Sequence, residues 1–183
     1  MDEKTKITEE IKNLCRKADQ NRSIQGMIKD NLVLINKIIL LYVTIGSAIC
    51  AMLIFASIPS TYQVWLGIFE ATIFIASIIP GTLNFDLKIL ERTTAVQAWG
   101  EWFRDAKNFI NVESLQLDAE SLVDKQKGLL DAYKKVMSST PLIPDNKFNK
   151  YKRLHLQKMK ISIALDQTPF KTLRQIKKDL SSK

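Results

Sequence analysis

The hydrophobic residues of this 183-residue chain are concentrated in two runs that lie close together in the sequence. The first run, about 38–58, has no charged residue, and the second, about 62–83, has one, Glu70. At about 1.5 Å of rise per residue, a helix of either length matches a hydrocarbon layer roughly 30 Å thick. Only Pro59–Thr61 separates the runs. The pattern therefore predicts two membrane-spanning helices in an antiparallel hairpin.

Basic residues near the ends of the two runs predict the orientation of this hairpin. Lys29 and Lys37 precede the first run, Lys88 and Arg92 follow the second, and the turn between them has no basic residue. Since basic residues collect on the cytoplasmic side, both termini are expected in the cytoplasm. The acidic, polar first ten residues do not have the composition of a cleavable signal peptide.

Apolar residues at helical spacing predict helices on both sides of the hairpin, so the expected fold is all-α. Residues 1–37 are expected to form cytosolic helices, with a break at Asn21–Ser23, and residues 38–85 the hairpin. A mostly apolar heptad pattern then predicts a long helix or helix pair over 86–140, packed in a bundle or coiled coil. Pro141 ends it, and 141–183 is expected to be a proline elbow followed by a basic helical tail.

Polar and small residues in the second run share one helical stripe. They recur at steps of three or four, together with one phenylalanine, at Gln63, Gly67, Glu70, Phe74, Ser77, Gly81 and Asn84. Positions at this spacing lie on one face of a helix, and a charge at membrane depth costs several kcal/mol without a partner or water. One interpretation is therefore that several hairpins form an aqueous pore lined by this stripe.

A second interpretation of the stripe needs no pore. Glu70 is then protonated, or bonded to Tyr42, Thr44 or Ser47 of the first helix, and the glycines only allow close packing. Small residues at four-residue spacing also predict helix contacts, either within the hairpin or between copies, at Ser47, Ala51, Gly67 and Ala71.

The tail after residue 144 contains eleven Lys or Arg against three Asp. Its first basic residues, including Lys147, Lys150, Lys152 and Arg153, are candidate contacts for anionic lipid, a nucleotide or RNA. The alternative is a solvated tail that packs through its apolar residues, Leu154, Leu156, Ile161 and Leu165.

Candidate catalytic chemistry is sparse, and the chain is predicted not to be an enzyme and to bind no cofactor. It has no phosphate-binding glycine loop, no nucleophile elbow and no Cys/His cluster at metal-ligand spacing. Cys15 and Cys50 are expected to be ordinary free thiols. His155 has no acidic neighbour in sequence. Trp99, Trp102 and Phe103 are more consistent with a hydrophobic core than with a ligand cage.

Two segments carry a resemblance to a known family. The run Ala98-Trp99-Gly100-Glu101-Trp102-Phe103, and the later Tyr133, Pro141-Leu142-Ile143-Pro144, Phe148 and Tyr151-Lys152, combined with a two-span hairpin, resemble the SLATT family. These are two-span effector domains found beside bacterial nucleotide-signalling and defence genes. The resemblance covers roughly residues 20–160, and it implies a pore-forming effector of the bacterial inner membrane. It also implies a trigger, either a partner protein or a nucleotide second messenger made during phage infection, followed by depolarisation and growth arrest.

Together these patterns predict a ring-shaped homo-oligomer in a lipid bilayer. A ring of Glu70 carboxylates would favour permeating cations, and Phe74 would act as a hydrophobic gate. The alternative is a membrane-anchored scaffold or receptor whose cytosolic helices and basic tail bind a partner, nucleotide or anionic lipid without ion flux.

Overall fold

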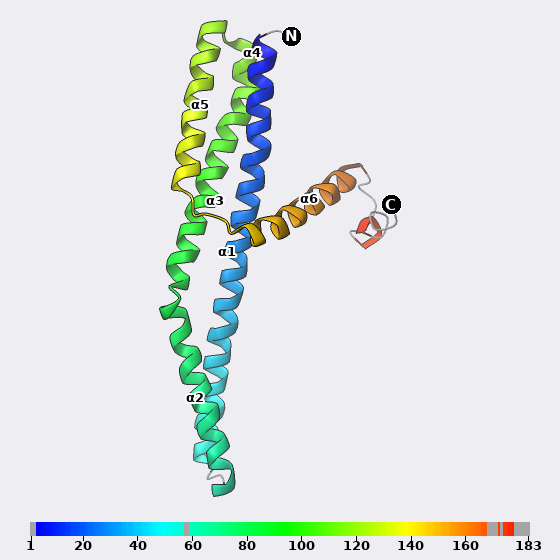
Figure 1. Ribbon diagram of the computed structural model, residues 1–183. Coiled ribbons are helices and arrows are strands. Elements are labelled where there is room, and N and C mark those ends of the chain that lie inside the picture. Colours follow the sequence, from blue (N-terminus) through cyan, green and yellow to red (C-terminus); the bar gives the residue numbers. More distant parts are fainter. Residues whose placement is uncertain (1–2, 57–58, 168–171, 173, 178–183) are drawn as a thin grey trace. The chain divides into compact units, whose positions relative to one another are not determined.

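All regular secondary structure in the described part of the chain is helical, as the sequence predicts. The computed structural model describes residues 3–56, 59–167, 172 and 174–177 (Figure 1). Contacts divide the chain into two compact units, one of Met1–Met27 with Ala95–Lys183 and one of Ile28–Thr94. Two helices are long and apolar enough to cross a membrane. The predictions of an all-α fold and of two apolar helices of spanning length are confirmed.

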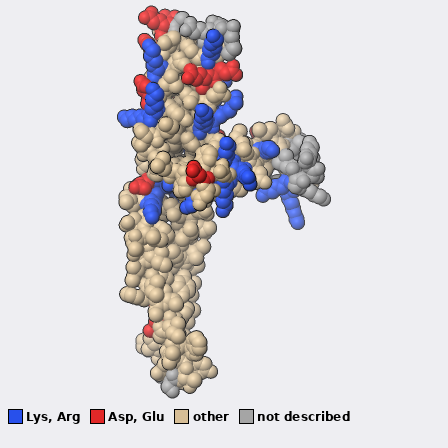
Figure 2. Space-filling view, viewed as in Figure 1, with Lys and Arg blue, Asp and Glu red and all other residues tan. Residues whose placement is uncertain are grey.

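The unit Ile28–Thr94 leaves most of its apolar surface uncovered. It is built from the second half of α1 (Glu3–Phe55), α2 (Ser60–Thr82) and the start of α3 (Phe85–Asn108). In the most apolar 18-residue stretches of the two candidate spans, only 11% and 6% of the residues are buried. The core helix of a water-soluble protein would be mostly buried instead. On the face shown in Figure 2, a long part of this unit's surface carries no charge except for one small acidic patch.

The predicted break at Asn21–Ser23 is wrong, because α1 is one continuous helix from Glu3 to Phe55. Asn, Arg and Ser within a helix cost at most about 0.7 kcal/mol each relative to Ala. Ala18 before them and Ile24 after them are both completely buried. Burial of a side chain such as Ile24 is worth roughly 1.5–3 kcal/mol, which outweighs the weak local preference for a break.

The helix of the second apolar run does not continue into the next helix of the chain. Pro80 lies inside α2, but the helix ends two residues later at Thr82. Asn84 then adopts a left-handed backbone with φ of 51°, which Asn tolerates better than most residues. The amide of Asn84 donates to the carbonyl of Gly81 at 3.1 Å, and that of Leu83 to the carbonyl of Ile79 at 2.9 Å. Two of the last four carbonyls of the helix, those of Ile79 and Gly81, are thus bonded, and α3 starts at Phe85.

The other unit contains a bundle formed by the first half of α1, by α3 and by α5 (Ala119–Ser139). Where the sequence predicts a long helix or a helix pair over 86–140, the structure has two helices, α3 and α5, with a wider turn, η1 (Phe109–Glu113), and a short α4 (Ser114–Gln116) between them. Asp118 caps α5 by accepting a hydrogen bond from the Ser121 amide at 3.2 Å. The buried core is Ile7, Ile11, Cys15, Ala18, Trp99, Trp102, Ala106, Phe109, Leu122 and Leu129.

The two tryptophans of α3 are part of this core, which confirms the choice of core over ligand cage. Trp99 is 1% exposed and Trp102 is 3% exposed. Both rings lie edge-on to Tyr133, at centroid distances of 5.3 and 5.1 Å. Trp102 Nε1 donates to the carbonyl of Leu129 at 2.9 Å. Trp99 Nε1 is buried with no hydrogen-bond partner among the described residues.

The last long helix, α6 (Asp145–Gln167), follows the predicted proline elbow and packs mainly through Tyr151 and His155. His155 has no acidic neighbour in the sequence, but in the folded chain its Nε2 lies 3.9 Å from Asp19 Oδ2 on α1. Leu154 and Leu156, expected to pack, are exposed. Ile161 and Leu165 are half-buried.

The two tryptophans allow a matched test of the bundle core. Trp102→Phe should lower the free energy of unfolding by about 1 kcal/mol more than Trp99→Phe, because only Trp102 loses a buried hydrogen bond. Both changes remove the same atoms from the core. Chemical denaturation followed by circular dichroism in detergent measures the difference, and equal losses would contradict the assigned bond.

Candidate functional site

The candidate site is built on α2, whose packing against α1 determines which side chains remain available. Ile73 is buried at this contact and Phe69 is half-buried. The closest approach is at Gly46 of α1, where a Cβ would lie 2.8 Å from Ile73 Cδ1 and 3.6 Å from Phe69 Cζ. Glycine is therefore needed at position 46 for the helices to pack this closely.

A side-chain hydrogen bond also joins the two helices. The hydroxyls of Tyr42 and Thr72 are 2.7 Å apart, and Thr72 Oγ1 lies 2.8 Å from the carbonyl of Phe69. Since a hydroxyl has one proton, Thr72 donates to that carbonyl and accepts from Tyr42. The Tyr42 ring also lies edge-on to Phe69, at 6.2 Å between centroids.

The polar stripe lies on a flank of α2 beside this contact. Each of its helical members from Gln63 to Gly81 is exposed, and Phe74 is 67% exposed. Phe74 and Glu70 each follow a residue of the α1 contact, Ile73 and Phe69, by one position, which is a rotation of about 100° around the helix. The stripe is thus continuous along α2 from Gln63 to Gly81 and is not covered by α1.

Glu70 is exposed on this flank. No hydrogen bond or ion pair joins it to Tyr42, Thr44 or Ser47, all of which belong to the described chain. Tyr42 bonds to Thr72, and Thr44 Oγ1 donates to the carbonyl of Leu40 at 2.8 Å. The bonds to the first helix that the second interpretation allows for Glu70 are therefore not formed.

The last member of the predicted stripe differs from the others. Asn84 is exposed but lies beyond the end of α2, in the left-handed turn before α3. The seven-residue spacing from Ser77 to Asn84 therefore does not place them on one helical face. Ser77 itself is in α2, where its hydroxyl donates to the carbonyl of Phe74 at 2.7 Å.

The small residues predicted for helix contacts face away from the α1–α2 contact. Ser47, Ala51 and Ala71 are exposed, and a Cβ at Gly67 would meet nothing within 4 Å. The contact uses Gly46 and Cys50 instead, both buried. They form a small pair of the same four-residue spacing, displaced by one position. The spacing of small residues fits both pairs, and it does not show which face of α1 meets α2.

The predicted basic contacts lie on α6. Lys147, Lys150, Lys152 and Arg153 are all exposed. Lys152 Nζ is 5.9 Å from the ring centroid of Phe148. These charges are therefore accessible on the surface of α6.

Metal and thiol chemistry have little support in the described residues. Among them, no group of three or more His, Cys, Asp or Glu side chains could hold a metal ion. Both cysteines are buried free thiols. Burial raises the pKa of Cys15 against the opposing effect of Lys107, with a further increase from Asp19. A protonated, buried thiol is a poor nucleophile.

Comparison with family models, with curated proteins and with solved structures gave no match. The geometry of α1 and α2 is therefore the basis for the functional argument.

The close approach at Gly46 gives a direct test of the α1–α2 contact. Gly46→Val should destabilise the protein by about 1–3 kcal/mol, because the new side chain overlaps Ile73. Gly67→Val is the matched control, since the space beside Gly67 is open. Thermal unfolding in detergent compares the two, and equal stabilities would contradict the helix contact described here.

Proposed function

We propose that this chain is a pore-forming membrane effector. In this proposal α1 and α2 cross the bilayer as a hairpin, and several copies close into a ring with the stripe of α2 along an aqueous axis. The observation that carries the proposal is the exposed row of polar and small residues, including the charged Glu70, on a helix whose other exposed residues are mostly apolar.

The free energy of a carboxylate in lipid supports this arrangement. A charged side chain at the centre of a bilayer costs at least about 2.5 kcal/mol, and Glu70 has no hydrogen-bond partner on α1 that offsets this cost. A ring of hairpins would give every copy of Glu70 access to water at once. It would also bring the carboxylates together, which favours entry of cations over anions.

The outward-facing small residues support contacts between copies. Ser47, Ala51 and Ala71 are exposed and take no part in the contact at Gly46. In lipid, helices associate through close packing of small residues rather than through the hydrophobic effect. These residues are therefore proposed to contact neighbouring hairpins.

Phe74 is proposed to close the resting pore. It lies one turn from Glu70 on the same stripe and is 67% exposed. A ring of phenyl groups narrows a pore and makes it unfavourable for water, which blocks ions without a covalent barrier.

The proposed setting follows from the basic residues and from the resemblance to the SLATT family. Lys29, Lys37, Lys88 and Arg92 favour cytoplasmic termini, in the inner membrane of a bacterium. The effector would be non-enzymatic, and a partner protein or nucleotide signal would open it during phage infection.

A second candidate function is a membrane-anchored scaffold or receptor. The exposed basic residues of α6, Lys147, Lys150, Lys152 and Arg153, favour it, since they are free to meet a partner, nucleotide or anionic lipid. This candidate predicts no ion flux and no effect of changes at Glu70.

The first test is the ion selectivity of wild-type protein and Glu70→Gln reconstituted in planar bilayers. Glu70→Gln should reduce the permeability ratio of K⁺ to Cl⁻ by about tenfold. A charged passage with low-dielectric walls raises the local concentration of counter-ions by at least about this factor. The reversal potential in a KCl gradient measures this ratio. Glu91→Gln is the matched control, because Glu91 is an exposed carboxylate outside the stripe. Conductance with unchanged selectivity would place the pore lining elsewhere, and no conductance would favour the scaffold.

The second test concerns the gate. Phe74→Ala should depolarise bacteria at expression levels at which the wild type does not, because the proposed barrier to water is removed. A voltage-sensitive dye reports the membrane potential. Ile75→Ala is the matched control, since Ile75 is 61% exposed but off the stripe. If both variants depolarise equally, loss of apolar volume rather than a gate is the cause.

A further inference from the structure

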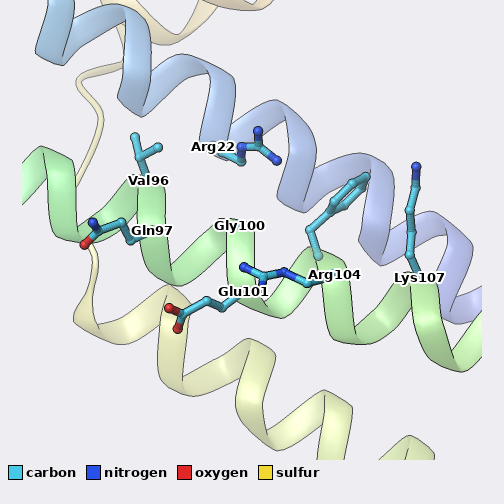
Figure 3. Close-up of a pocket in the computed structure, with 8 residues that line it drawn as sticks. Arg22, Val96, Gln97, Gly100, Glu101, Arg104 and Lys107 are labelled. Atoms are coloured by element: carbon cyan, nitrogen blue, oxygen red, sulfur yellow. The ribbon is translucent and has the colours of Figure 1, made fainter.

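A second site lies in the bundle unit, in a groove between α1 and α3. The groove has a volume of about 730 Å³, within the range of small-molecule sites. Its lining residues are Arg22 from α1 and Val96, Gln97, Gly100, Glu101, Phe103, Arg104 and Lys107 from α3 (Figure 3). None of these residues belongs to the hairpin or to the basic tail, the two parts of the chain for which the sequence predicts binding or pore-lining residues.

The charges around this groove are predominantly positive. Arg22, Arg104 and Lys107 stand against one carboxylate, Glu101. In Figure 3, Arg22 and Arg104 lie on either side of Gly100, and the Glu101 carboxylate points away from Arg22. All three basic side chains are exposed, and no ion pair within the described residues links any of them to a carboxylate.

Gly100 lines the groove beside Arg22. A Cβ at this position would lie 3.8 Å from Arg22 Cδ, which is ordinary van der Waals contact. Phe103 forms part of the wall, and Lys107 Nζ lies 4.8 Å from its ring centroid, which holds this ammonium group at the groove.

We infer that this groove binds a phosphate-bearing anion through Arg22, Arg104 and Lys107. Planar guanidinium groups bind phosphate oxygens with two parallel hydrogen bonds, and an ammonium group adds a compact positive charge. Three cations with a single opposing carboxylate suit a ligand with more than one negative charge, such as an oligophosphate. The phosphate belongs either to a soluble molecule or to a lipid headgroup.

A neighbouring hollow extends the site toward α6. It shares Arg22 and Val96 with the groove and has a volume of about 400 Å³. Its wall includes Lys158 and His155 of α6, and Asp19 of α1 lies 3.9 Å from His155. A ligand held by Arg22 therefore lies at the edge of the contact between α1 and α6.

The test is isothermal titration calorimetry of the full-length protein in uncharged detergent with inorganic tripolyphosphate. Arg22→Gln and Arg104→Gln should each weaken binding about tenfold or more, since each removes charged hydrogen bonds. Arg22→Lys should restore only part of the affinity, because it keeps the charge but loses the planar fork. Circular dichroism confirms that these surface variants remain folded.

Arg153→Gln is the matched control, because it removes the same charge from an exposed position on α6. An equal loss of affinity in this control would show unspecific charge attraction and would overturn the site. A second arm measures binding to vesicles of phosphatidylglycerol against phosphatidylcholine. Binding of tripolyphosphate that depends on Arg22 identifies a soluble ligand, and dependence seen only with phosphatidylglycerol identifies a headgroup.

If neither probe depends on Arg22, the inference is wrong. The measurement uses no membrane potential, so its failure does not bear on ion conduction. The binding and conductance experiments therefore distinguish a pore that lacks the anion site from an anion site in a protein that forms no pore.

Discussion

The uncovered apolar surface of α1 and α2 is the constraint on which the rest of this structure depends. The contact at Gly46, Cys50 and Ile73 buries only one stripe of each helix. Large side chains such as Phe55 and Trp65 are at least 70% exposed. Covering a side chain of this kind is worth roughly 1.5–3 kcal/mol, so a row of them in water would be strongly unfavourable. An apolar environment outside this chain, such as lipid, is needed to cover this surface, whereas the bundle unit buries a core of its own.

The polar side chains of these apolar helices differ in whether their own helix can satisfy their hydrogen bonds. The hydroxyl residues can be satisfied in this way, and Glu70 cannot. Thr44, Thr72 and Ser77 donate to carbonyls three or four residues earlier, which satisfies a hydroxyl without help from outside the helix. An ionised carboxylate has no proton to donate, and the amides around it are already bonded within α2. Glu70 therefore needs either a proton or a polar environment from outside its own helix. A water-filled axis would provide such an environment, which is why the proposed pore explains more of the stripe than packing alone does.

Local periodicity was sufficient to predict the all-α fold and the two apolar helices of spanning length. Local periodicity failed where contacts between residues far apart in the sequence determine the structure. Burial of Ala18 and Ile24 carries α1 through Asn21–Ser23, and Asp19 meets His155 from a remote part of the sequence. The choice of Gly46 over Ser47, and the groove that joins Arg22 to α3, depend likewise on which helix faces meet. Single-sequence spacing defines the faces of each helix but contains no information on their partners.

The two helices that carry the apolar surface, α1 and α2, differ in how they connect to the rest of the chain. This difference determines where the backbone can bend. α1 has no interruption, and the same helix supplies Arg22 to the groove and Gly46 to the contact with α2. α2 instead contains Pro80 and ends at a left-handed Asn84 before α3 begins. Large changes in backbone angle are absorbed by a few residues at the ends of helices, and bending a continuous helix breaks hydrogen bonds. Between α2 and α3, a change of direction is therefore absorbed most easily at Leu83–Asn84, whereas α1 has no such break between Glu3 and Phe55.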